Sequence, residues 1–338
     1  KITPHSLFCF YENLSTIRNL FSLIEPDRMI SSYLQEEVTL NITKICDNFQ
    51  KVFNATFMME MCRDMNTMDF DTNFINRGVN KDLDMCVDLR EDSMSKLEAI
   101  RTYLDSVIAK GEKHNKNDFV KIHETDKSGI MLQCTSRRSN ILKQQIQAGK
   151  HKVILGFITN SGHNEQFDFI PDVHTSIATG SNVNITNEMI TEITNNIVQS
   201  KQKMKDIITL IYNQFINDLQ NYETEFLNLV QFCSTLDLLQ NMCYIANKYK
   251  YHKPIVKTGD KSYIMAKELR HPLIEQLNSE ELYVTNDVSI GLEKDLMLLY
   301  GTNAVGKTSI IRALGINLIM AQAGLYVACS QFEFVPYN

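Results

Sequence analysis

The chain has 338 residues, of which 43% are hydrophobic and 22% are charged, and its formal net charge is −6. This balance excludes a disordered chain and a protein coated in basic surface, although a local basic patch can still bind nucleic-acid phosphates. The length predicts two or three domains.

Cysteine spacing and apolar runs restrict the cellular setting. The eight cysteines form no C-x-x-C pair, which is typical of reduced thiols in a soluble intracellular protein and gives no sign of a structural zinc site. No apolar run has the length of a membrane span or of a signal peptide. The chain begins with Lys1 rather than Met and ends at Asn338 soon after the last predicted helix, so we expect both ends to be cuts through a larger protein.

Residues 1–118 are predicted to be mainly helical. Over 81–110, apolar residues recur every three or four positions and mark one face of a long helix, which the polar run 111–118 ends. Weaker versions of the same pattern over 14–24 and 38–53 predict further helices.

Residues 119–184 change character. Short alternating or β-branched runs separated by glycines predict a small β-rich insertion. It holds the densest basic cluster of the chain, made up of Arg137, Arg138, Lys143, Lys150, His151 and Lys152. By itself, such a run of charges is typical of a solvated charged loop.

Residues 185–250 return to a helical pattern. Apolar residues again step by three or four without a proline, Thr186 is the expected N-cap, and Glu188 lies favourably in the first turn. A helix, a β insertion and a returning helix describe an arm with a small domain at its tip. Periodicity alone favours the alternative, a compact helical bundle with a β excursion.

Residues 251–338 predict the start of an α/β domain. Prolines and Gly259 separate short apolar runs, and residues 296–300 are predicted to form a buried strand. An apolar helix follows over 310–321, with Gly324 as its expected C-cap.

Between this strand and helix, residues 301–308 read GTNAVGKT and match G-x-x-x-x-G-K-[ST]. Gly301 and Gly306 let the backbone curl so that its N–H groups point at phosphate oxygens. Lys307 supplies a compact positive charge, and the Thr308 hydroxyl can ligate Mg²⁺. A glycine-rich turn before a surface lysine is the weaker interpretation, because an apolar strand and an apolar helix flank the motif.

The neighbouring segments resemble the MutS family of DNA mismatch-repair ATPases. Residues 268–275 read ELRHPLIE and residues 281–287 read ELYVTND, and both are similar to elements that open the ATPase domain of that family. Residues 301–309 resemble its GPNxxGKS(T) loop, with Thr302 replacing Pro and Val305 replacing Gly. Residues 321–328 resemble its QxGxYVPA run, with Ala328 replacing Pro. Weaker similarities at 76–84 and 184–189 match its lever helices.

The resemblance implies a mixed, mainly α fold with a small β-rich clamp insertion, followed by the N-terminal part of a P-loop α/β ATPase domain of the ABC type. In order, residues 1–118 are core and lever helices, 119–184 the clamp, 185–250 the returning lever helix, and 251–338 an incomplete ATPase domain.

The resemblance also implies roles for individual residues. Tyr283 stacks on adenine with Val284 beside it, and the clamp position of the basic cluster implies contacts with DNA phosphates. The residues implied to hold the phosphates and Mg²⁺ are Gly301, Asn303, Gly306, Lys307, Thr308 and Ser309. His271 matches the family motif, but we interpret it as a core histidine.

The Walker B acids are expected beyond Asn338, so no catalytic residue is assigned. A fragment that ends there should not turn over ATP, and it should expose apolar surface around 296–300.

The implied function is an ATPase that recognises mismatched or damaged double-stranded DNA, uses ATP and Mg²⁺, and forms a homo- or heterodimer with a MutS-like subunit, away from membranes. Another ABC- or SMC-like DNA-organising ATPase is the alternative, but it would require a sustained heptad repeat, which these helices lack. A third interpretation, an interaction module with a vestigial loop, is opposed by the intact Lys307 and Thr308.

Overall fold

The computed structural model describes residues 2–37, 41–112, 118–125, 129–147, 152–178, 180–277, 283–303 and 305–337. The chain divides into two compact units, each described by itself. The first comprises Lys1–Arg28 and Asn41–Phe226, and the second comprises Met29–Leu40 and Leu227–Asn338. As the sequence predicted, the described chain is mainly helical and carries small sheets.

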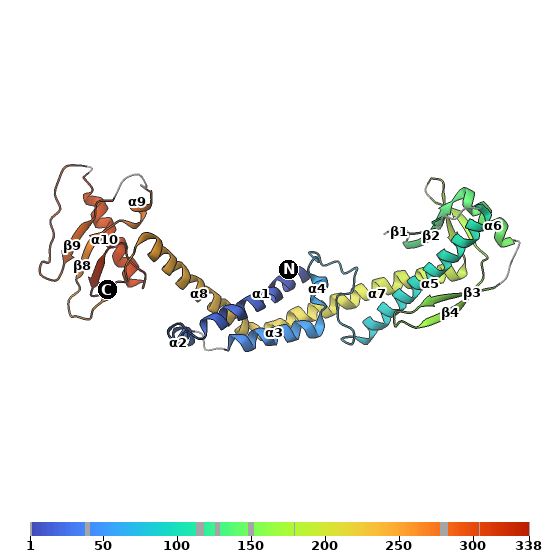
Figure 1. Cartoon of the computed structure of the whole chain (residues 1–338), viewed down its shortest axis with the longest axis horizontal. Coiled ribbons are helices and arrows are strands. Elements are labelled where there is room, and N and C mark those ends of the chain that lie inside the picture. Colours follow the sequence, from blue (N-terminus) through green and yellow to red (C-terminus); the bar gives the residue numbers. More distant parts are fainter. Residues whose placement is uncertain are drawn as a thin grey trace. The chain divides into compact units, whose positions relative to one another are not determined.

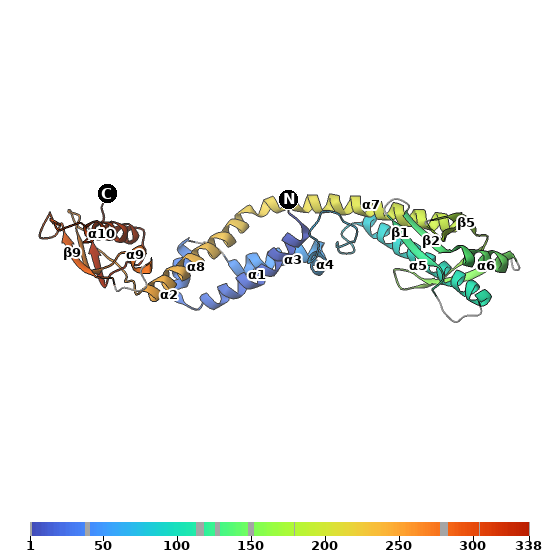
Figure 2. The same cartoon turned by 90° about the horizontal axis from the view of Figure 1, so that it is seen from above.

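The first unit contains most of the helices (Figures 1 and 2). The helices of the whole described chain are α1 (Pro4–Ile24), α2 (Arg28–Glu37), α3 (Ile42–Thr56), α4 (Met59–Cys62), α5 (Lys81–Glu112), α6 (Ser136–Gln147), α7 (Glu188–Asp218), the 3₁₀ turn η1 (Leu219–Tyr222), α8 (Glu223–Tyr249), α9 (Pro272–Leu277) and α10 (Lys307–Gln322).

The strands fall into two four-stranded sheets and one hairpin. The first unit holds a sheet of order β1-β2-β6-β5 and the hairpin β3-β4, all antiparallel, and the second unit holds a sheet of order β7-β10-β8-β9. Their bounds are β1 (Lys121–Thr125), β2 (Gly129–Thr135), β3 (Val153–Ile158), β4 (Asn164–Phe169), β5 (His174–Ile177), β6 (Asn182–Thr186), β7 (Ile255–Val256), β8 (Ile264–Leu269), β9 (Asn286–Ile290) and β10 (Gln331–Phe334).

The long helices α5 and α7 lie side by side (Figures 1 and 2) and confirm the predicted helical periodicity. Leu97, Ile100 and Leu104 of α5 form one core with Ile193 and Ile197 of α7, and the sheet and α6 add their apolar faces to it. Burial of these side chains supplies the main driving force for pairing the two helices.

A buried carboxylate fixes the chain where it leaves α5 and enters the sheet. Asp105 is 3% exposed, and its Oδ1 accepts hydrogen bonds from the backbone N–H groups of Phe119 (2.9 Å) and Val120 (2.6 Å). Arg101 donates to Asp105 Oδ2 at 3.1 Å, so the buried charge is paired and hydrogen-bonded.

The predicted β-rich insertion carries the strands β1 to β6 and also contains the helix α6, in which Ser139, Leu142 and Ile146 are buried at the spacing of one helix face. One local prediction in this unit was wrong. Thr186 is not the N-cap of α7, since it pairs with His174 in the sheet. Asn187 takes that role, and its side chain accepts from Ile190 N at 2.7 Å.

The second unit packs α10 against its sheet (Figure 1). β10 runs parallel to β7 and antiparallel to β8, and β8 runs antiparallel to β9. Ala313 and Ala321 of α10 meet Ile264 and Phe332 of the sheet in one core. Gly324 has φ +81° directly after the C-cap residue Ala323, the left-handed position that commonly follows a helix.

The predicted strand over residues 296–300 was wrong. The sheet ends at β9, and a segment without a pairing partner cannot satisfy its backbone groups as a strand. The expected exposure of apolar surface is confirmed, because Leu296, Leu298 and Tyr300 are 82%, 79% and 88% exposed. Met297 packs against the core instead.

All eight cysteines are free, which agrees with the thiol pattern in the sequence. Burial raises the pKa of the Cys134 thiol to about 11 and the pKa of the Cys62 and Cys329 thiols to about 12. Within the described ranges, none of the helices has the combination of length and apolarity needed to cross a membrane.

Candidate nucleotide-binding site

The loop before α10 has the backbone that its two glycines allow. Gly301 and Gly306 have φ of +155° and +92°, and a side chain at Gly306 would meet no atom within 4 Å. Gly306 is the N-cap residue of α10 and makes no side-chain capping bond. The first N–H groups of the 16-residue helix therefore have no side-chain acceptor at Gly306.

Lys307 lies at the first position of α10, and its ammonium group folds back on the loop. Its Nζ donates to the backbone oxygens of Gly301 (2.7 Å) and Thr302 (2.5 Å). Phosphate oxygens are stronger acceptors than neutral carbonyls for such a donor. The lysine can therefore exchange these carbonyls for a phosphate that enters the loop.

The remaining residues of the motif surround the same helix start. Asn303 and Thr308 are exposed and Ser309 is half-buried, while Ala304 lies outside the described residues. Glycine backbone, unused helix N–H groups, one lysine and one hydroxyl are a donor set that fits a Mg²⁺–triphosphate group. Across the described ranges, no three His, Cys, Asp or Glu side chains gather as metal ligands.

Tyr283 and Val284, the residues matched to adenine, differ in exposure. Tyr283 is half-buried, and its hydroxyl faces the backbone of His271 just before α9. Burial, with the charge of Glu275, raises the pKa of the Tyr283 phenol. Val284 is 80% exposed, so it offers an open apolar surface beside a fixed ring.

His271 is the core histidine that the sequence predicted. It is 5% exposed, and its Nδ1 accepts from the backbone N–H of Ile274 at 3.4 Å. This buried imidazole, with its local hydrogen bond, is part of the packing at the start of α9.

The basic cluster of the first unit divides into free and engaged residues. Arg137, Arg138 and Lys143 lie on α6, and Lys152 precedes β3, whereas Lys150 and His151 lie outside the described residues. Arg137 and Lys143 are exposed. The Arg138 guanidinium lies 4.6 Å from the Phe119 ring centroid and 3.9 Å from Glu112, and Lys152 pairs with Asp168 at 2.5 Å. Arg137 and Lys143 are therefore the better candidates for contacts with an external phosphate.

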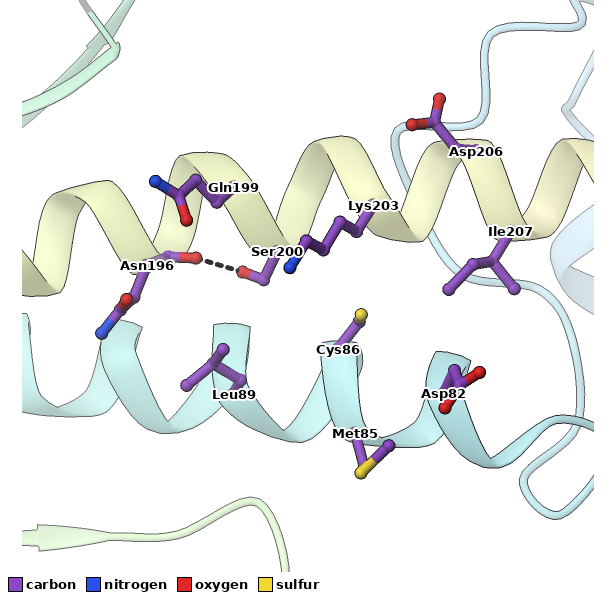
Figure 3. A pocket seen from close by; sticks show the side chains of 10 residues that line it. All are labelled: Asp82, Met85, Cys86, Leu89, Asn196, Gln199, Ser200, Lys203, Asp206 and Ile207. Carbon is purple, nitrogen blue, oxygen red and sulfur yellow. Dashed lines mark hydrogen bonds between the residues drawn. The ribbon is translucent and has the colours of Figure 1, made fainter.

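A separate cavity of about 420 Å³ lies between α5 and α7 (Figure 3). Cys86 points into it from α5, and Lys203 extends into it from α7. The Ser200 hydroxyl on its wall already donates to Asn196 O at 2.6 Å. Its lining combines apolar and polar side chains, and it shares no residue with the loop at 301–309.

Sequence reasoning missed one buried polar group in α10. Asn317, in the middle of the apolar helix α10, is fully buried and bonds to the backbone of Arg270 and Ala328. A lone amide within an otherwise apolar helix face was the signal that could have revealed it, because a buried amide requires partners.

The fold and the loop define a mainly helical protein with a G-x-x-x-x-G-K-T loop at the start of α10. No protein-family model matches the chain. The chain is nevertheless similar to curated members of the MutS family, and this similarity supports a divergent member of that family.

Three relatives illustrate this similarity. A DNA mismatch repair MutS homologue of Acanthamoeba polyphaga mimivirus is 24% identical over 99% of this chain and 33% of the relative. The mitochondrial DNA mismatch repair MutS homologue of Sarcophyton glaucum is 36% identical over 47% of this chain and 16% of the relative. The DNA mismatch repair protein MutS of Caldanaerobacter subterraneus is 31% identical over 41% of this chain and 16% of the relative. The chain thus spans a third or less of the length of these relatives.

Proposed function

We propose that this chain is part of an ATP-dependent DNA mismatch-repair protein and that residues 301–309 bind Mg²⁺–ATP. The observation that carries the proposal is the left-handed Gly306 at the start of α10, with Lys307 beside it in the loop. The names of the relatives favour mismatch repair over an SMC-like DNA-organising function.

Each residue of the loop has a role in this proposal. Backbone N–H groups from Gly301, Asn303 and Gly306 hold the phosphate oxygens, and Lys307 offsets the charge of the β- and γ-phosphates. Thr308 ligates Mg²⁺, Ser309 supports the phosphate site, and Tyr283 and Val284 receive the adenine. Bound Mg²⁺ supplies positive charge that neutralises the phosphates.

The rest of the chain follows the order of lever, clamp and ATPase elements. Residues 1–118 and 185–250 serve as core and lever helices, 119–184 as the clamp, and 251–338 as the first part of the ATPase domain. In the clamp, Arg137 and Lys143 contact phosphates of double-stranded DNA without reading its sequence, and Arg138, Lys150 and Lys152 add to the local positive charge. The whole protein binds mismatched or damaged DNA as a homo- or heterodimer.

A nucleotide titration tests the loop directly. Lys307→Ala removes the only cation of residues 301–309, and a charge-assisted hydrogen bond contributes roughly 1.5–3 kcal/mol. We therefore expect affinity for a fluorescent ATP analogue with Mg²⁺ to fall by roughly 10- to 100-fold. Arg312→Ala, which removes an exposed cation from the same helix, is the matched control and should bind like the wild type. Equal affinity of Lys307→Ala and wild type would overturn the proposal.

A further inference from the structure

A polar network joins the end of α8 to the turn between β8 and α9. The Arg270 guanidinium donates to the backbone oxygens of Tyr249 (3.2 Å) and Lys250 (2.9 Å), which terminate α8. The same guanidinium forms an ion pair with Glu275 of α9 at 2.8 Å, and both side chains are largely buried, with 21% and 11% exposed. Arg270 thus acts as the cap for carbonyls that a helix leaves unpaired at its C-terminal end.

The backbone of Arg270 is held from the other side by α10. Asn317 Nδ2 donates to Arg270 O (3.0 Å) and Ala313 O (2.8 Å), and Asn317 Oδ1 accepts from Ala328 N (2.6 Å). Arg270 N in turn donates to Ala328 O at 2.8 Å. Asn317 is 0% exposed, so its amide is satisfied entirely within the protein. One residue, Arg270, therefore connects α8 through its side chain and α10 through its backbone.

Backbone strain gathers at the same place. Among the described residues, the non-glycine residues with positive φ are Lys250 (+54°) and Glu268 (+50°). Lys250 follows α8, and its carbonyl is one of the two that accept from Arg270. Glu268 lies where the pairing of β8 with β9 shifts register, two residues before Arg270, and its N–H donates to Asp287 at 2.8 Å. Strained backbone persists only where its surroundings hold it, and it concentrates at elements that switch.

We propose that Arg270 is a positioning residue that links nucleotide occupancy of residues 301–309 to the conformation of the C-terminal end of α8. The link rests on the proposed function, because it needs a phosphate at the start of α10. Asn317 lies ten positions after Lys307 on that helix, about 15 Å along its axis. A helix moves as a rigid element, so a shift at its first turn moves Asn317, then the backbone of Arg270, and finally the carbonyls at the end of α8.

Hydrogen exchange measured by mass spectrometry tests this link on the whole chain, with and without a nonhydrolysable ATP analogue and Mg²⁺. In the wild type we expect the analogue to change the exchange rate of amides at 246–252 by at least about threefold. Arg270→Lys keeps the positive charge. A lysine has a single ammonium group in place of the planar guanidinium, so it cannot bind both carbonyls and Glu275 at the same time. This variant should bind the analogue within about twofold of the wild type and lose the change at 246–252.

A purely structural role for Arg270 gives a different result. Arg270→Lys would then raise exchange at 246–252 by the same factor with and without the analogue. The change that the analogue causes would be as large as in the wild type, and this result would overturn the inference. Glu275→Gln is a second variant, for the case that Arg270→Lys does not fold, and it retains an acceptor for Arg270. In this variant the analogue should change exchange at 246–252 less than in the wild type. Arg312→Lys on α10 is the matched control and should keep the wild-type change. A wild-type chain that binds no analogue would contradict the proposed function instead.

Discussion

Arg77 and Asp88 form a two-pronged ion pair, with Nη1–Oδ1 at 2.9 Å and Nη2–Oδ2 at 2.7 Å. Asp88 Oδ1 also accepts from Asn160 Nδ2 at 2.7 Å, and the Asn160 N–H donates to Asp92 at 2.7 Å. These bonds hold the turn of the β3-β4 hairpin against α5. The Arg77 contact, followed by the Asn160 contact, lowers the pKa of the Asp88 carboxyl.

Asp88→Asn should loosen this turn with little effect on global stability. The pair is partly exposed, so we expect a loss of under about 1 kcal/mol in the free energy of unfolding. Amide exchange at residues 159–163 should rise several-fold, because the substitution removes the negative charge and one of the two acceptor oxygens that Arg77 and Asn160 use. Glu91→Gln on the same helix is the control. Unchanged exchange at 159–163 would contradict a role of Asp88 in holding the hairpin.

A second ion cluster predicts how stability depends on pH. Lys205 contacts Asp71 at 2.7 Å and Lys201 contacts it at 3.3 Å. The hydrogen bond from Lys205, with that from Lys201, lowers the pKa of the Asp71 carboxyl below its ordinary value. A carboxyl whose folded-state pKa is lowered stabilises the fold above its unfolded pKa, and this contribution is lost as the pH falls through the folded pKa.

Asp71→Asn should therefore destabilise the protein near neutral pH and have less effect in acid. Asp71 is half exposed, so the difference at about pH 7 should be under about 1 kcal/mol, and it should be smaller at an acid pH below the lowered pKa of this carboxyl. Urea unfolding at both pH values measures it. Asp64→Asn, at an exposed position nearby, is the control. A difference that stays constant with pH would exclude the ion pairs as its cause.

The adenine assignment predicts a selective loss. Tyr283→Ala should weaken ATP binding by roughly 0.5–1.5 kcal/mol, the usual contribution of an aromatic pair, while inorganic triphosphate binds as before. Tyr283→Phe keeps the ring and should bind ATP nearly normally. Competition titrations with both ligands measure the effect. Equal losses for ATP and triphosphate would mean that Tyr283 supports the loop instead of the base.

The DNA assignment predicts a change in salt dependence. Replacing Arg137 and Lys143 with Ser should lower affinity equally for matched and mismatched duplexes and flatten the log–log salt slope by ~0.9 per lost contact. The matched pair of substitutions, Arg138→Ser with Lys152→Ser, should change the slope less, because Phe119, Glu112 and Asp168 already engage those cations. An unchanged slope in the first variant would leave α6 as an ordinary solvated helix.

The sequence by itself determined the features that depend on neighbouring residues. The spacing of apolar side chains predicted α5 and α7, because a helix repeats every 3.6 residues and each buried face must recur at that interval. The left-handed positions of Gly306 and Gly324 followed from local backbone sterics, because glycine has no Cβ and adopts a positive φ without a steric clash. The G-x-x-x-x-G-K-T motif can also be found from the sequence, because its residues are adjacent in the chain, and its role in binding phosphate stays a prediction.

Only the tertiary structure decided the features that need distant partners. Residues 296–300 have the composition of a strand, but a strand forms only where another pairs with it, and the sheet ends at β9. The sequence predicted Lys152 as a free cation, but its Nζ lies 2.5 Å from Asp168 Oδ2 across the β3-β4 hairpin. Arg270 and Asn317 lie 47 residues apart, and Asp88 and Asn160 lie 72 apart. Hydrogen bonds over such separations carry no local periodicity, so their partners become known only when packing brings the backbone and side chains together.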